Sequence, residues 1–160
     1  MHARARVFLG ILAAGLAMTT AAWAANNGYH GSLCTPAWPD DVGRVAFNRW
    51  GVSNLSDDES LVACGASPAV SSNVTKVEVV VYDKQPAADV CCTIYIQDAA
   101  GEIITSAKRC SAGFGNSAQT LSYSPPVNMV GTLSMLCSIP AKSPVNGVSR
   151  VTSYRVETDP

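Results

Sequence analysis

The feature that most constrains the fold is a pair of adjacent cysteines at the start of an alternating segment. In Cys91-Cys92-Thr-Ile-Tyr-Ile96, Cys92 shares one side of a strand with Ile94 and Ile96, while Cys91 lies on the other side. The residues 75–82 repeat this period of two and are rich in β-branched side chains, which strands favour. Only a short connection separates the two segments, so we expect them to be antiparallel neighbours.

Further strands are expected on either side of this pair. They cover residues 45–52, 60–64, 103–110, 119–124, 130–139 and 148–157, separated by loops rich in Gly, Pro and Ser. In the last strand, one face is expected to carry Val148, Thr152, Tyr154 and Val156, with Arg150 among them. The pattern predicts an all-β, antiparallel β-sandwich of about seven to eight strands, as one domain over residues 25–160 with an irregular N-terminal arm at 25–42.

The first 24 residues have the organisation of a signal peptide. Arg4 and Arg6 precede an uncharged run, and Ala22-Trp23-Ala24 is a typical cleavage site; an uncleaved N-terminal anchor is the alternative. We therefore expect a secreted or periplasmic protein. No later apolar stretch approaches the roughly 20 residues of a transmembrane helix, and no basic run suggests a nucleic-acid partner.

All six cysteines follow the expected cleavage site, which predicts three disulfides in an exported chain. If the turn after the Cys91 strand centres between residues 99 and 100, Ile96 faces Ile103 and Cys91 comes close to Cys110. The inward Cys92 then pairs across the sandwich interior with Cys137, and Cys34–Cys64 remains. Six cysteines allow fifteen pairings, and an exchange of the partners of Cys91 and Cys92 is the main alternative.

Candidate catalytic and metal-binding residues are few. His30 is the only histidine after the cleavage site, it lies in the irregular arm, and no nucleophile motif accompanies it, so we expect a solvated loop residue. Asp57, Asp58 and Glu59 fall in a turn and do not match a calcium loop. We predict no catalytic residue, metal or cofactor, and keep a carboxylate-based hydrolase acting on glycans as the alternative function.

Aromatic side chains offer a different kind of site. Tyr29, Trp38 and Trp50 would stack on sugar rings if they were exposed together on one surface. The ordinary role of such residues in a small sandwich is packing, so we expect Trp50 in the core and Trp38 over its edge.

Over most of the chain after the expected cleavage site, the sequence resembles a group of uncharacterised exported proteins of Gram-negative bacteria. The resemblance lies in Val79-Val-Val-Tyr-Asp83, Cys91-Cys92-Thr, Cys110, Cys137 and Val151-Thr-Ser-Tyr-Arg-Val156. It implies an exported, six-cysteine β-rich fold and no particular activity. The sequence as a whole predicts a non-enzymatic binding or structural module, with a glycan, another envelope protein or a second copy of the chain as its partner.

Overall fold

The computed structural model describes residues 25–66, 73–98, 100–124 and 132–159; the expected signal peptide lies outside these ranges. Within them the chain forms eleven strands and two short 3-10 helices, η1 (Gly31–Leu33) and η2 (Pro39–Asp41). The strands are β1 (Ala25–His30), β2 (Thr35–Pro36), β3 (Val45–Asn48), β4 (Gly51–Asn54), β5 (Ser60–Ala66), β6 (Asn73–Tyr82), β7 (Cys91–Gln97), β8 (Ile103–Cys110), β9 (Gln119–Tyr123), β10 (Thr132–Ile139) and β11 (Arg150–Asp159). Neither helix of this described part is long and apolar enough to cross a membrane.

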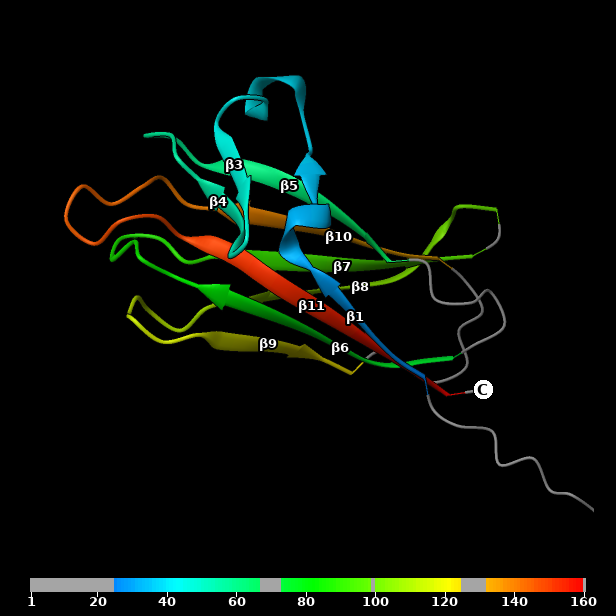
Figure 1. Cartoon of the computed structure of the whole chain (residues 1–160). Helices are drawn as coiled ribbons and strands as arrows, with labels where there is room; N and C mark the ends of the chain where they lie inside the picture. The colour runs from blue at the N-terminus through cyan, green and yellow to red at the C-terminus, as the bar shows by residue number, and fades with distance from the viewer. Residues whose placement is uncertain (1–24, 67–72, 99, 125–131, 160) are drawn as a thin grey trace, which may run out of the picture.

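The strands form two antiparallel sheets that pack face to face (Figure 1). One sheet has the order β3-β4-β11-β6-β9, with β1 also paired to β11, and the other has the order β2-β5-β10-β7-β8. This confirms the predicted β-sandwich. The strand number is higher than expected because the arm at 25–42 contains β1 and β2, and the segment 45–52 folds into the β3–β4 hairpin rather than one strand.

The core consists of the inward side chains of both sheets. The β6 residues Val77, Val79 and Val81 are fully buried, and they face a second layer that includes Ile94 and Ile96 of β7. Burying each aliphatic side chain stabilises the fold by about 1.5–3 kcal/mol. The alternation in the sequence therefore located the core correctly in both strands.

The expected pairing of β6 with β7 is wrong, because the two strands belong to different sheets. The connection between them crosses from one sheet to the other and is fixed by the buried carboxylate of Asp83. This carboxylate accepts hydrogen bonds from the backbone amides of Gln85 and Val90 and from the hydroxyls of Ser111 and Ser149. The short connection between β6 and β7 therefore crosses from one sheet to the other instead of forming a hairpin, and the hydrogen bonds of Asp83 hold it in place.

The three disulfides join Cys34 to Cys64, Cys91 to Cys110 and Cys92 to Cys137, the pairs expected from the strand faces. Cys92–Cys137 is nevertheless not a bridge across the interior. The two residues are opposite each other on the neighbouring strands β7 and β10 of one sheet, with their Cα atoms 4.0 Å apart. Both are fully buried, so the bridge lines the core without connecting the two sheets.

The register of the β7–β8 hairpin also differs from the prediction. Ile96 faces Thr105 rather than Ile103, and Cys91 faces Cys110 directly. A bulge between Ile96 and Gln97 accounts for part of the shift. Because the alignment at Ile96 moves by an even number of residues, the inward and outward faces of β7 stay as predicted.

Candidate functional site

A bulge in β11 determines which side chains face outward from the first sheet. The register of β11 against β6 shifts between Val151 and Ser153, so Arg150 lies opposite Tyr82 and Arg155 opposite Glu78. Both arginines therefore face outward although they are five positions apart, an odd step that would put them on opposite faces of a regular strand. The expectation that Arg150 shares a face with Tyr154 and Val156 is wrong, because Arg150 faces outward whereas Tyr154 and Val156 are buried in the core; the bulge reverses the alternation between them.

Two glycines pack against the backbone at this bulge. A Cβ atom on Gly31 would lie 2.2 Å from the carbonyl oxygen of Val151, and one on Gly51 would lie 2.0 Å from the same oxygen. Gly51 also has a φ of +111°, which side chains other than glycine rarely adopt. The end of β1 and the start of β4 can thus meet at one point of β11, which places the turn of the β3–β4 hairpin beside His30.

Hydrogen bonds hold this turn, formed by Arg49 and Trp50. The amide of Trp50 donates to Asn48 Oδ1 at 2.8 Å, and His30 Nε2 donates to the carbonyl of Arg49 at 3.1 Å. His30 Nδ1 accepts a hydrogen bond from the amide of Ser32, so the proton of the neutral imidazole lies on Nε2. His30 is exposed, as expected, but it positions the turn rather than standing free.

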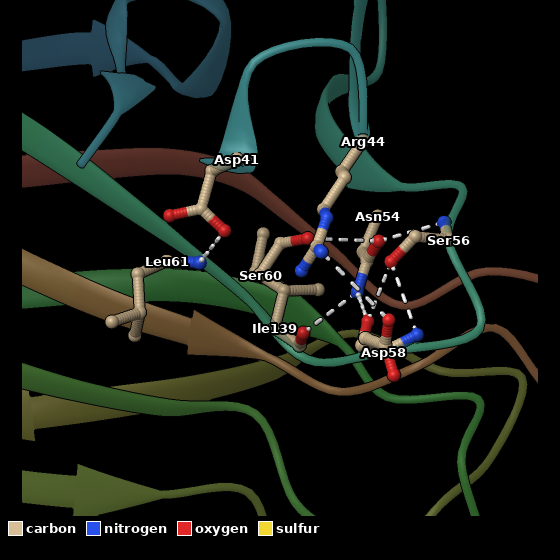
Figure 2. A network of polar contacts seen from close by, with 8 residues as sticks. All are labelled: Asp41, Arg44, Asn54, Ser56, Asp58, Ser60, Leu61 and Ile139. Atoms are coloured by element: carbon tan, nitrogen blue, oxygen red, sulfur yellow. Dashed lines mark hydrogen bonds and ion pairs between the residues drawn. The ribbon is translucent and has the colours of Figure 1, made fainter. Parts of the chain in front are cut away.

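The other end of the hairpin is held by the buried amide of Asn54 (Figure 2). Its Nδ2 donates to the carbonyls of Asp58, Ile139 and Pro140, and its Oδ1 accepts from the amide of Ser56 and the hydroxyl of Ser60. The hairpin is therefore fixed at both ends, which limits the movement of the side chains on its turn.

Trp50 is exposed, which contradicts the expected place in the core. The accessible fraction of the residue is 53% because Trp50 lies in the turn and not inside a strand. The guanidinium carbon of Arg49 lies 4.7 Å from the centre of the indole, and that of Arg150 lies 5.9 Å from it. Arg150 also lies 4.1 Å from the centre of the Tyr82 ring. We call Arg49, Trp50, Tyr82 and Arg150 the Trp50 surface.

An open hollow of about 450 Å³ continues from His30 over the outer face of the same sheet. It is lined by Gly28, Tyr29, His30, Glu78, Val80, Ser153, Tyr154 and Arg155. Its far end carries paired charges, since Arg155 contacts Glu78 and Glu157, and Lys76 lies 2.6 Å from Glu78. The hydrogen bond from Lys76, with that from Arg155, lowers the pKa of Glu78 despite partial desolvation. The hollow is therefore lined by the uncharged residues Val80 and Ser153 and, at its far end, by the paired charges around Glu78 and Arg155.

The other aromatic residues predicted for ligand stacking have different positions. Tyr29 is half-buried and stacks on Tyr154, with ring centres 5.0 Å apart and planes 13° apart, so one face of its ring is covered. Burial raises the pKa of Tyr154, whose hydroxyl donates to the carbonyl of Gly65. Trp38 is 60% exposed next to η2 and lines neither hollow. Tyr29 thus borders the same hollow as His30, whereas Trp38 does not.

A second hollow of about 430 Å³ lies on the outer face of the other sheet. Two carboxylates line it, those of Glu59 and Asp89, and both residues are exposed. The other acids of the predicted turn form ion pairs, Asp57 with Lys142 and Asp58 with Arg44. Across residues 25–66, 73–98, 100–124 and 132–159, no group of three His, Cys, Asp or Glu side chains could hold a metal ion.

Solved structures of similar fold include several carbohydrate-binding modules. The CBM36-1 domain of a multidomain xylanase from the hindgut metagenome of Trinervitermes trinervoides is similar with a TM-score of 0.50 and 11% identity, over 82% of this chain and 96% of that one. The carbohydrate-binding module CBM36 in complex with calcium and xylotriose has a TM-score of 0.48 and 10% identity, over 82% and 98% of the two chains. The xylan-binding module CBM86 from Roseburia intestinalis has a TM-score of 0.45 and 13% identity, over 84% and 96%.

No family model and no curated protein matches the sequence. At such identities, the likeness to the CBM36-1 domain establishes a shared β-sandwich fold and nothing about ligands.

Proposed function

We propose that this chain is an exported, non-enzymatic glycan-binding module whose ligand stacks on Trp50 and extends into the adjoining hollow. The observation that carries the proposal is the exposed indole of Trp50, held on a turn that is fixed at both ends of its hairpin. A large apolar ring held in one place offers contact area to a sugar ring without the entropic cost of ordering a loop.

Three further points support this proposal. The hollow beside His30 contains Ser153, and its lining leaves space at Gly28, where a Cβ atom would meet no atom within 4 Å. The CBM36-1 domain of similar fold is by name a carbohydrate-binding module of a xylanase, which makes a glycan the first ligand class to examine. The three disulfides suit an extracellular or periplasmic location.

Affinity electrophoresis against a panel of soluble plant and bacterial polysaccharides tests the proposal, with Trp50→Ala and Trp38→Ala compared with the native chain. We expect Trp50→Ala to weaken binding about ten-fold or more, because it removes the stacking face. Trp38→Ala removes an equally exposed tryptophan elsewhere and should leave binding unchanged. Equal losses in both variants, or no retardation by any polysaccharide, would contradict the proposal.

The hydrolase alternative rests on Glu59 and Asp89, which line the second hollow together. It predicts release of new reducing ends from one of the same polysaccharides, with loss of that release in Glu59→Gln and Asp89→Asn. Their exposure argues for the binding function instead, because catalytic carboxylates usually lie in a site that excludes water.

Self-association is favoured by one observation on β8, the outer strand of the second sheet. Ile103 and Ile104 are 57% and 52% exposed there, whereas Lys108 and Arg109 follow at the other end of the strand. Exposed apolar edge strands pair with other chains, and charges oppose this. Sedimentation velocity over a range of concentrations distinguishes a monomer from a dimer formed through this edge.

A further inference from the structure

We propose that the Trp50 surface selects glycans that carry carboxylate groups, that is, uronic-acid saccharides, over neutral ones. The inference rests on the proposed glycan-binding function and specifies its ligand. It depends on the lack of acidic partners for two guanidinium groups, those of Arg49 and Arg150.

Neither guanidinium has an acidic partner among the described residues. Arg155 contacts Glu78 and Glu157 and Arg44 contacts Asp58, but the side chains of Arg49 and Arg150 make no ion pair or hydrogen bond there. Both lie against aromatic rings, and their terminal Nη groups have no hydrogen-bond partner among the described residues. A planar pair of such donors matches the two oxygens of a carboxylate.

Unsatisfied buried polar atoms gather at the same place. In the described part of the chain, the buried side-chain atoms without a hydrogen-bond partner are Arg150 Nε and Thr152 Oγ1, both at the bulge of β11. Thr152 also lies against Gly51, at the start of β4 directly after Trp50. Buried donors without partners are unfavourable, so the Arg150 guanidinium keeps unused hydrogen-bonding capacity beside Trp50 that a polar ligand group could take up.

The position of Arg49 further disfavours a neutral sugar. Its guanidinium lies 4.7 Å from the centre of the indole, so a sugar that stacks on this face must displace the exposed Arg49 side chain. A neutral sugar would break the cation–π contact between Arg49 and the indole and would offer the guanidinium no negative charge in return. A uronic acid would offer Arg49 a carboxylate in exchange.

General attraction of anions does not account for such binding. Without Arg4 and Arg6 the chain has nine basic and twelve acidic residues, so its net charge repels an anionic polymer. Recognition of an acidic glycan must therefore be local, through named side chains.

Calorimetric titration of the native chain with tetragalacturonate and with its fully methyl-esterified form tests this inference, since the two probes share one saccharide backbone and esterification removes the negative charges. We expect the acid to bind about ten-fold more tightly or better, and Arg150→Gln and Arg49→Gln each to reduce that preference several-fold. The control is Arg109→Gln, which removes the same charge from β8 of the other sheet and should keep the preference. Thermal unfolding of each variant verifies that it folds.

The outcomes separate the two proposals. If both probes, or neutral glycans alone, bind through Trp50 and Arg150→Gln changes nothing, the module binds glycans but the acidic preference is wrong. If no glycan binds and Trp50→Ala has no effect, the proposed function itself fails. If polyglutamate of equal charge binds as tightly as tetragalacturonate, the surface recognises anions in general and the saccharide assignment is wrong.

Discussion

The two faces of β11 differ in composition and in what they contribute. Its inward side chains, such as Val151 and Val156, are fully buried in the core between the sheets. Its outward face carries Arg150 on an aromatic surface and Arg155 in an ion-pair network. The bulge after Val151 puts both arginines on the outward face, so we expect that the stability of the fold and the proposed recognition can be changed separately. The same contrast between inward and outward side chains should hold for the neighbouring strands of both sheets.

The largest effect is expected from the inward disulfide. Cys137→Ser should lower the free energy of unfolding by about 4 kcal/mol from loop entropy alone, and further because it places a hydroxyl and an unpaired thiol at Cys92 in the core. Cys110→Ser opens a shorter loop, whose exposed end should limit the loss to about 3 kcal/mol or less. The sequence separations are 45 and 19 residues.

Guanidinium titration under non-oxidising, non-reducing conditions measures both losses. A loss in Cys110→Ser as large as that in Cys137→Ser would show that the outward bridge stabilises the fold as much as the inward one. The expected difference between the two faces of β7 would then be wrong. Treatment of the native chain with a mild reductant gives an independent check, because the exposed Cys110 should make Cys91–Cys110 the first bridge to open.

An intermediate effect is expected from Tyr123, which is buried and donates a hydrogen bond to the carbonyl of Cys92 at 2.7 Å. Burial raises its pKa from 10.0 to about 12, the hydrogen-bonding and charge influence of Arg109 acting in the opposite direction. The folded-state pKa thus exceeds the unfolded one, so the neutral phenol stabilises the fold fully below pH 10. That contribution, about 2–3 kcal/mol, is lost as the pH rises toward 12.

Unfolding free energies of the native chain and Tyr123→Phe at pH 8 to 12 test this expectation. Tyr123→Phe should lose about 1 kcal/mol at pH 8, through the missing hydrogen bond, and should fall less steeply above pH 10. Parallel curves for the two chains would mean that the Tyr123 phenol ionises equally well in the folded state.

Local patterns in the sequence were sufficient to predict which face of each strand is buried, but not which strands pair with each other. Cys92 was placed inward because alternation is a property of adjacent residues, and this also suggested its partner Cys137. Whether the two lie in one sheet depends on the crossing at Asp83, whose partners Ser111 and Ser149 are distant in the sequence. No local pattern contains that information.

The candidate site was less predictable for a similar reason. Trp50 was expected in the core because a single strand was assumed over 45–52, although Asn48 and Gly51 flank it as residues suited to a turn. The bulge of β11 was invisible because it depends on contacts with Gly31 and Gly51. These are the features that bring Arg150 to Trp50, so the surface could be found only from the fold.

The smallest effect, and the sharpest comparison, concerns the two outward arginines. Arg155→Gln removes contacts with Glu78 and Glu157 and should lower the free energy of unfolding by about 0.5–1 kcal/mol, since the side chain of Arg155 is 41% exposed and its ion pairs are screened. Arg150→Gln loses a cation–π contact but also removes the buried, unpartnered Nε, so the net change should lie within about 0.5 kcal/mol of zero. Salt distinguishes the causes: at 1 M NaCl the loss in Arg155→Gln should shrink, because the Debye length falls to about 3 Å, while Arg150→Gln should not change. A large, salt-sensitive loss in Arg150→Gln would instead reveal a charge partner within the protein, and Arg150 would then belong to the stability of the fold rather than to a binding surface.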